Sequence, residues 1–224
     1  MKSMILITHC KNFGQLGNKM NSIRLVIFDL DGVIVDACEW HRVALNKALA
    51  EVCDYTISME DHYTTFNGIP TKVKLSKLTE MGIVKPDQHE EIYDRKQQLT
   101  VETINLSAPR RQEKIDLIKY LREQGCYVAC YTNSIRETAT LMLDKTGVLE
   151  QMDYLLTNQD VENSKPHPEG YNFLVEKFNL KKHQVLIIED SPKGKQAAYA
   201  SGCNVLEVKD PDEVTIDTLR EYFE

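Results

Sequence analysis

The amino-acid sequence lacks any long apolar run. No stretch of its 224 residues approaches the ~20 consecutive apolar residues that a membrane-spanning helix needs, so we expect no membrane partner. The first twenty residues carry only a short apolar patch at 4–7 and no small-residue cleavage site, so the sequence predicts no secretory signal. Internal repeats and low-complexity tracts are also missing. Because 42% of the residues are hydrophobic and 27% are charged, a real core can form and global disorder is not expected.

Basic residues are outnumbered by acidic ones. The 27 Lys and Arg against 34 Asp and Glu give a formal net charge of −7, which argues against nucleic-acid binding. A small anionic substrate remains compatible with this balance, because a few local cations and a metal ion can invert the local field. The six cysteines come without a predicted signal and therefore indicate reduced thiols in the cytoplasm. We expect a monomer or a weak homodimer.

Apolar strands and amphipathic helices alternate through most of the chain. Buried strands are predicted at 23–30, 127–131, 154–156, 185–188 and 204–208, and helices at 113–124, 137–145, 169–178, 193–201 and 214–223. Strands that alternate with helices of about ten residues indicate βαβ units. The sequence therefore predicts an α/β fold with a parallel sheet.

The segment 38–107 breaks this alternation. It has helical patterns but no convincing buried strand. We therefore predict a core built from 21–37 and 108–224, with 38–107 inserted after the first strand as a small helical domain. Residues 1–20 fit neither part and form an N-terminal extension, which is either loosely ordered or adds an edge strand at 4–8.

Polar residues follow the ends of the predicted strands. They stand in four groups: Asp29-Leu30-Asp31-Gly32, Thr132-Asn133-Ser134, Ser164-Lys165-Pro166 and Glu189-Asp190-Ser191. The carboxyl ends of parallel strands meet at one edge of a sheet, where α/β proteins bind their ligands. Acids at the end of an apolar run are costly to bury without a partner. Their position therefore indicates a functional role for this edge of the sheet.

The four groups, in this order, resemble the motifs of the haloacid dehalogenase-like hydrolase superfamily. The motifs read DLDGV, YTNS, SKP and EDS, and the resemblance extends from about Arg24 to Val208. It implies a Rossmann-like core of three layers with a parallel sheet, plus a small helical cap inserted after the first strand. Asp210 and Asp212 also form a D-x-D pair, but they lie late in the chain and we assign no chemistry to them.

The resemblance implies a role for each motif residue. Asp29 would be the nucleophile that forms an aspartyl-phosphate. Asp31 would protonate the leaving alcohol and then take a proton from the attacking water. Gly32 would let the backbone approach the phosphate. Lys165 would neutralise the nucleophile and the transferred phosphoryl group. Thr132 would bind phosphate oxygens through its hydroxyl, with Asn133 close by.

The resemblance also implies a magnesium ion. Mg²⁺ is a hard ion that prefers oxygen ligands. The carboxylate of Asp29, the backbone carbonyl of Asp31 and the carboxylate of Asp190 would hold it. Glu189 would either add a ligand or orient water, and an acid that does not touch the metal is the other reading.

The inserted helices resemble the cap of the subfamily that contains β-phosphoglucomutase and phosphoglycolate phosphatase. Such a cap would close over the site, exclude water and select the substrate. His41 matches a histidine that couples cap closure to the acid–base aspartate, although an ordinary helix-surface histidine is the other reading. Asn67-Gly68-Ile69-Pro70 resembles the substrate-specificity loop. The mutase has an arginine just after this glycine. Here Thr71 and Lys72 follow, and Lys72 would bind phosphate as a point charge without the fork of arginine.

A second departure from the subfamily is the pair Arg110 and Arg111. Relatives tend to have a Pro-Gly pair at this place, where the helix after the cap begins. Two readings stay open. Either the arginines lie near the site and favour an acidic substrate, or they form a solvated helix start.

Together these features predict a magnesium-dependent phosphatase that acts on a small phosphorylated metabolite, such as a sugar phosphate or phosphoglycolate. A phosphomutase of the β-phosphoglucomutase type is the alternative, since a second substrate hydroxyl can replace water as the acceptor. A non-catalytic binding protein is less expected, because all four motifs keep their reactive residues. A dehalogenase is disfavoured because that branch does not need Asp31 and Asp190 for a metal.

Overall fold

The computed structural model describes residues 23–223, so the predicted extension 1–20 and its alternative strand at 4–8 lie outside the described residues. Within residues 23–223, one sheet contains β1 (Leu25–Phe28), β2 (Tyr127–Tyr131), β3 (Tyr154–Leu156), β4 (Val185–Glu189) and β5 (Asn204–Glu207), in the order β3-β2-β1-β4-β5. All neighbouring strands are parallel. Leu25 in the central strand pairs with Tyr127 on one side and with Val185 on the other. The prediction of an α/β fold with a parallel sheet is confirmed.

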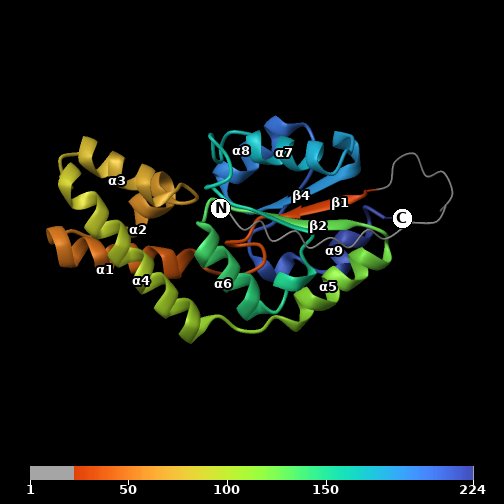
Figure 1. Cartoon of the computed structure of the whole chain (residues 1–224), viewed down its shortest axis with the longest axis horizontal. Coiled ribbons are helices and arrows are strands. Elements are labelled where there is room, and N and C mark those ends of the chain that lie inside the picture. Colours follow the sequence, from red (N-terminus) through yellow and green to blue (C-terminus); the bar gives the residue numbers. More distant parts are fainter. Residues whose placement is uncertain (1–22, 224) are drawn as a thin grey trace, which may run out of the picture.

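Helices cover both faces of this sheet (Figure 1). One face carries α7 (Glu169–Lys177) and α8 (Pro192–Ser201), and the other carries α5 (Gln112–Glu123), α6 (Arg136–Thr146) and α9 (Ile216–Arg220). Side chains alternate along each strand, so Leu25 and Ile27 join the core under α7 and α8, whereas Val26 and Phe28 join the opposite core. Burial on both faces explains why these strands are apolar throughout. None of the helices in residues 23–223 is long and apolar enough to cross a membrane.

Between β1 and α5 the chain forms a separate helical cap, which lies at the left of Figure 1. Its elements are α1 (Cys38–Cys53), α2 (Met59–Asp61), a π-helical turn (His62–Phe66), α3 (Thr71–Glu80), a 3-10 turn (Pro86–Gln88) and α4 (His89–Ser107). Their apolar faces form a core of their own, which includes Leu45, Phe66 and Leu78. The helical cap inserted after the first strand therefore agrees with the predicted fold class, and we propose 38–107 as its extent.

The C-terminal segment differs from the prediction. The helix expected at 214–223 is shorter, because α9 covers only Ile216–Arg220. Thr215 fixes its start by accepting a hydrogen bond from the backbone N–H of Thr218. Asp210, which the sequence left without a role, accepts hydrogen bonds from the backbone N–H groups of Asp212 and Glu213 and so caps a 3-10 turn.

Candidate active site

The polar residues that follow the strands meet at the C-terminal edge of the sheet. Asp29 comes directly after β1, and Thr132 comes directly after β2. Glu189 is the last residue of β4, and Asp190 follows it. Carboxylate oxygens of Asp29, Glu189 and Asp190 lie within 4.8 Å of one another. Lys165 arrives from the loop before α7 and contacts this group. The structure thus brings together predicted residues from all four motifs.

Lys165 binds two of the three acids. Its ammonium donates hydrogen bonds to Asp29 Oδ1 at 2.6 Å, to Glu189 Oε1 at 2.5 Å and to the carbonyl oxygen of Tyr131 at 2.8 Å. The ring centroids of Tyr131 and Tyr171 lie 4.7 and 5.3 Å from the same ammonium. Burial lowers the pKa of Lys165, but the charges of Asp29 and Glu189 outweigh it and raise the pKa well above its ordinary value. Lys165 is therefore a permanent cation.

One ammonium does not balance three carboxylates. Burial raises the pKa of Asp29, although Lys165 opposes this, and burial with the charge of Glu189 raises the pKa of Asp190 to about 7. Oδ1 of Asp190 is buried and has no hydrogen-bond partner among the described residues. A divalent cation would supply both the missing positive charge and a partner for this oxygen. The residues present therefore fit the predicted magnesium ion.

Gly32 keeps the space beside Asp190 open. Its φ of +91° is in the region that favours glycine, and a Cβ there would lie 2.2 Å from Asp190 Oδ2. Glu189 lies deeper and is 0% exposed. Its Oε1 accepts hydrogen bonds from both Lys165 and the Tyr171 hydroxyl, each 2.5 Å long, while its Oε2 has no partner in residues 23–223. Tyr171 was not predicted, because it lies in α7 outside every motif.

Asp31 has a separate set of partners. His41 Nε2 lies 3.0 Å from Oδ1, and the hydroxyl of Ser134 donates to Oδ2 at 2.9 Å. The Thr132 hydroxyl donates to the same oxygen at 3.3 Å. Burial raises the pKa of Asp31, but the charge of His41 and the hydrogen bonds from His41 and Ser134 outweigh it, so the pKa lies below its ordinary value. Ser134 belongs to the second motif, although it was not among the predicted site residues.

His41 joins the cap to the core, because it belongs to α1 and contacts Asp31. Its Nδ1 lies 3.2 Å from the ammonium of Lys96 in α4. Burial lowers the pKa of His41, and the positive charge of Lys96 lowers it further. Sequence reasoning missed Lys96. A signal existed, because Lys96 falls on the buried face of α4 between Ile92 and Leu99, where a lysine is unusual.

Asn133 is a second link between core and cap. Its side-chain amide donates to the carbonyl oxygens of Gly68 at 2.8 Å and Lys165 at 3.1 Å. Its Oδ1 accepts a hydrogen bond from the backbone N–H of Lys165 at 3.1 Å. In this arrangement the Asn133 side chain fastens the cap loop around Gly68 to the loop that carries Lys165.

The predicted basic residues outside the motifs lie in two different places. Lys72 lines the cavity between cap and core, but it is exposed, and its ammonium is 5.6 Å from the ring centroid of Tyr93. Arg111 is paired with Asp212 at the start of α5, and neither Arg110 nor Arg111 lines the cavity. The arginine pair is therefore the solvated helix start, and not part of the site.

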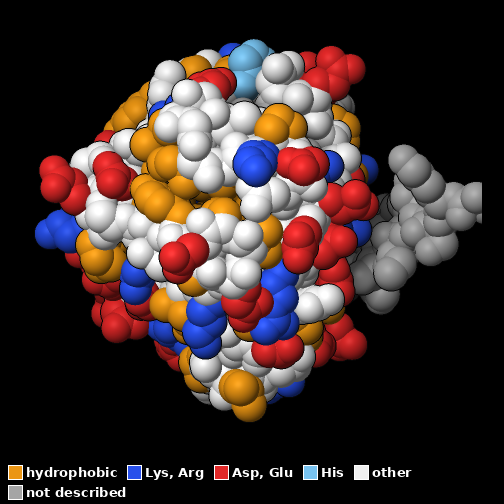
Figure 2. Space-filling model, turned by 90° about the vertical axis from the view of Figure 1, so that its left-hand side faces the viewer, with side chains coloured by type: hydrophobic (Ala, Val, Ile, Leu, Met, Phe, Trp, Pro, Cys, Tyr) orange, Lys and Arg blue, Asp and Glu red, His pale blue; other side chains and the backbone are white. Residues whose placement is uncertain are grey.

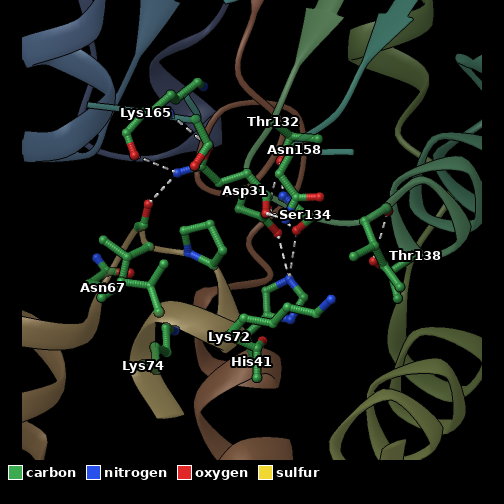
Figure 3. Close-up of a pocket in the computed structure, with 18 of the residues that line it drawn as sticks. Asp31, His41, Asn67, Lys72, Lys74, Thr132, Ser134, Thr138, Asn158 and Lys165 are labelled. Atoms are coloured by element: carbon green, nitrogen blue, oxygen red, sulfur yellow. Dashed lines mark hydrogen bonds and ion pairs between the residues drawn. The ribbon is translucent and has the colours of Figure 1, made fainter. Parts of the chain in front are cut away.

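The cavity between cap and core has a volume of about 440 Å³. Lys165, Thr132 and Asn158 line it from the core, and His41 and Lys74 line it from the cap (Figure 3). Clefts of this size hold small metabolites. Predicted carboxylates line the cavity on the core side, and cap side chains line it on the other side.

A family model described as haloacid dehalogenase-like hydrolase matches residues 26–208, which include all four motifs. The chain belongs to this family. The prediction of this superfamily, and of an enzyme of its hydrolase type, is confirmed.

Relatives of this haloacid dehalogenase-like hydrolase match over most of their length. Pyrophosphatase PpaX of Bacillus pumilus is 23% identical over 188 residues, with 81% of each chain covered. Phosphoglycolate phosphatase of Vibrio cholerae is 25% identical over 189 residues, which cover 82% of this chain and 83% of the relative. The crystal structure of β-phosphoglucomutase from Clostridium difficile matches with a TM-score of 0.77 and 20% identity, over 90% of this chain and 97% of that one. This structural likeness shows a shared fold, and the names of the two relatives agree with a phosphatase.

Proposed function

We propose that this hydrolase is a magnesium-dependent phosphatase that cleaves a small phosphorylated metabolite through an aspartyl-phosphate on Asp29. The observation that carries the proposal is the pairing of Asp29 with the Lys165 ammonium, 2.6 Å away, beside an Asp31 that is held by the cap. Phosphoglycolate phosphatase among the relatives supports a substrate of the sugar phosphate or phosphoglycolate type.

Asp29 is the nucleophile of the proposed reaction. The carboxylate oxygen that Lys165 does not bind attacks the phosphorus, the bond from phosphorus to the ester oxygen breaks, and an aspartyl-phosphate and an alcohol result. Water then attacks this phosphorus, the bond to Asp29 breaks, and inorganic phosphate leaves. Lys165 neutralises Asp29 before the reaction and the phosphoryl group during it. Thr132 directly follows β2, and its hydroxyl would turn from Asp31 to a phosphate oxygen when the substrate binds.

Asp31 moves the proton in both steps. The pKa of Asp31 is low in this structure, and the negative charge of an incoming phosphate would raise it so that the carboxyl takes up a proton when the substrate binds. Asp31 gives this proton to the leaving alcohol oxygen and later takes one from the attacking water, so the proton count closes over one turnover. His41 and Ser134 hold the two oxygens of its carboxylate and fix its direction. Because His41 belongs to the cap, Asp31 has this geometry when the cap lies over the core and excludes bulk water.

Asp29, Asp190 and the backbone carbonyl of Asp31 would hold the magnesium ion. When bound, the ion neutralises the negative charge that gathers between the carboxylate and the phosphate. Asp190 offers the buried oxygen that has no partner among the described residues. We assign Glu189 to holding Lys165, since its Oε1 is engaged by Lys165 and Tyr171.

The test is a panel of phosphorylated metabolites, including glucose 1-phosphate and phosphoglycolate, assayed with the full chain and Mg²⁺. We expect release of inorganic phosphate that a chelator abolishes and added Mg²⁺ restores. Isomerisation of glucose 1-phosphate to the 6-phosphate without phosphate release would instead identify the phosphomutase alternative.

The nucleophile is tested with a matched pair of variants. Asp29→Asn lowers kcat at least about 1000-fold, because the covalent step is lost. Asp36→Asn changes an exposed aspartate shortly after the same motif and keeps the activity. Full activity in the Asp29→Asn variant would overturn the covalent route.

A further inference from the structure

Tyr171 in α7 lies behind the buried acids of the site. It is 0% exposed and does not line the cavity, so a substrate in the cavity does not contact it. Its hydroxyl donates a hydrogen bond of 2.5 Å to Oε1 of Glu189, which is also buried. Burial and the charge of Glu189 raise the pKa of Tyr171 well above its ordinary value, so the hydroxyl keeps its proton and remains a donor. The reaction proposed above gives Tyr171 no role.

The carboxylate of Glu189 has two competing sets of partners. Its Oε1 accepts hydrogen bonds from Tyr171 and Lys165, whereas its Oε2 is buried and has no partner among the described residues. A carboxylate oxygen of Glu189 also lies within 4.8 Å of oxygens from Asp29 and Asp190, so a cation held by those two acids would be close to it. Glu189 can therefore serve either the ammonium or a metal ion. The two hydrogen bonds to Oε1 favour the ammonium.

Burial strengthens this competition. On the outer end of the cap, acidic and basic side chains are interspersed at the surface, where water and salt screen their charges (Figure 2). Glu189 has no such screening, and among the described residues only the Lys165 ammonium forms an ion pair with it. A buried carboxylate that lost this ammonium without gaining another cation would be strongly unfavourable. Because each cation interacts strongly with Glu189 here, a single hydroxyl that fixes the direction of the carboxylate can decide between them.

Packing fixes the direction of the Tyr171 hydroxyl. The ring lies edge-on against Tyr131, with ring centroids 4.9 Å apart and an interplanar angle of 86°. Tyr131 is itself packed tightly against Gly170, because a Cβ on this glycine would lie 2.2 Å from the Tyr131 ring. The Tyr131 hydroxyl is buried without a partner in residues 23–223, so of the two hydroxyls only that of Tyr171 acts on the site.

We propose that Tyr171 is a positioning residue that holds Glu189 on Lys165 and so keeps this carboxylate from ligating the magnesium ion. The inference rests on the proposed function, because it assumes an ion held by Asp29 and Asp190. Glu189 then balances the charge of Lys165 beside the nucleophile. The ion has one carboxylate ligand fewer, and it therefore binds less tightly than the three neighbouring acids would allow.

The test is calorimetric titration of the metal-free full chain with Mg²⁺, in the absence of substrate. Tyr171→Phe keeps the ring and removes the hydroxyl, so Glu189 loses one of its partners and turns to the ion. We expect the Kd for Mg²⁺ to become about tenfold lower. General damage to the fold would weaken binding, so it cannot produce this result. Tyr131→Phe is the matched control, because it removes a buried hydroxyl that has no partner among the described residues and should keep the Kd of the unchanged chain.

A double variant then assigns the tighter binding to Glu189. Glu189→Gln replaces the carboxylate with a neutral amide, which attracts the ion far less. When it is combined with Glu189→Gln, Tyr171→Phe should change the Kd by less than about twofold, because the hydroxyl acts only through the carboxylate. Tyr171→Met also removes the hydroxyl and should lower the Kd in the same direction. It is included so that poor folding of one variant does not decide the result.

The outcomes separate this inference from the proposed function. An unchanged Kd in the two hydroxyl-free variants overturns the inference, and so does tighter binding that persists with Glu189→Gln. A higher Kd also overturns it, and would identify Glu189 as a metal ligand that Tyr171 holds in place. All three results leave a Mg²⁺-dependent phosphatase standing.

Two further results concern the proposed function itself. If no variant binds Mg²⁺, both the inference and the magnesium dependence of the proposed reaction are wrong. If no phosphorylated metabolite is hydrolysed but Tyr171→Phe tightens Mg²⁺ binding through Glu189, the phosphatase proposal fails while the role of Tyr171 stands.

Discussion

Nε2 of His41 in the cap lies 3.0 Å from Oδ1 of Asp31 in the core. The residue proposed to carry the proton is thus held by a side chain from the part of the molecule that covers the site. Lys96, from another cap helix, lies 3.2 Å from the other ring nitrogen of His41. The direction of one carboxylate therefore depends on the position of two cap helices. In the proposed reaction, Asp31 has this orientation only when the cap lies over the core.

The first prediction concerns this contact. His41→Asn lowers kcat by about 10- to 100-fold with a smaller change in KM, because Asp31 loses its orientation while the phosphate contacts remain. Lys96→Met lowers kcat in the same direction but less, since it acts through His41. Steady-state kinetics on the best substrate of the panel measure both. His89→Asn is the control, because His89 is a cap histidine that bonds Thr79 and does not line the cavity. Equal losses in the two histidine variants would mean that general damage to the cap is the cause.

The second prediction concerns the link between Asn133 and the cap loop. Asn133→Ala removes hydrogen bonds to the carbonyl oxygens of Gly68 and Lys165, so the loop is less firmly held. We expect faster hydrogen exchange around Gly68 and a kcat/KM that falls about tenfold.

Asn204→Ala is the matched control for this variant. Asn204 also donates to two carbonyl oxygens, those of His183 and Val185, but at the opposite end of the sheet. Its loss lowers stability without changing exchange around Gly68. If exchange around Gly68 is also unchanged in the Asn133→Ala variant, Asn133 does not hold the loop.

The motif acids and the sheet could be predicted because they depend on short stretches of sequence. Tyr127–Tyr131 and Tyr154–Leu156 are strands at the predicted bounds, since each is a compact run of residues that suit a buried strand. Asp29 and Asp190 directly follow the neighbouring strands β1 and β4. The carboxyl ends of parallel strands all lie at the same edge of the sheet, so the two residues come close together. Local sequence pattern and sheet topology together were enough to predict which core residues come together.

The cap residues that line the cavity could not be predicted in the same way. The meeting of Lys74 and Lys96 with the core depends on how the cap helices rest on the sheet, and no local pattern encodes that arrangement. Both lysines do break the apolar faces of their helices, next to Leu75 and between Ile92 and Leu99. A lysine on a buried helical face is therefore a usable sign of a site, although it does not say what the lysine will meet.

The third prediction concerns Gly194, which lies in the first turn of α8 against Glu189. A Cβ at this position would lie 2.0 Å from Glu189 Oε2, so Gly194→Ala displaces the carboxylate that holds Lys165. We expect kcat to fall at least about tenfold and the free energy of unfolding to fall by about 1–3 kcal/mol. Gly82→Ala is the control, because Gly82 has φ +75° but no atom within 4 Å of the added Cβ. It loses about 1 kcal/mol of stability and keeps its kcat. An active Gly194→Ala variant would show that the position of Glu189 does not matter to Lys165.

The last prediction follows from the unfavourable burial of Lys74. Its pKa is about 8 in the folded protein against an ordinary 10.5, mainly because of burial, and the charge of Asp31 offsets only part of this. Between these pH values the unfolded chain binds more protons than the folded protein, so stability rises with pH. Below pH 8 the buried charge lowers the free energy of unfolding by its full amount, about 1–3 kcal/mol. Lys74→Met should therefore be more stable than the unchanged chain at pH 7, by about that amount, and the difference should shrink towards pH 10.

Denaturant unfolding at pH 7 and pH 10 measures this difference, with Lys77→Met as the control on the same helix. Lys77 is only half-buried, so its replacement should change stability by no more than about 0.5 kcal/mol. A Lys74→Met variant that is less stable at pH 7 would mean that interactions within the protein compensate for the burial of the Lys74 ammonium.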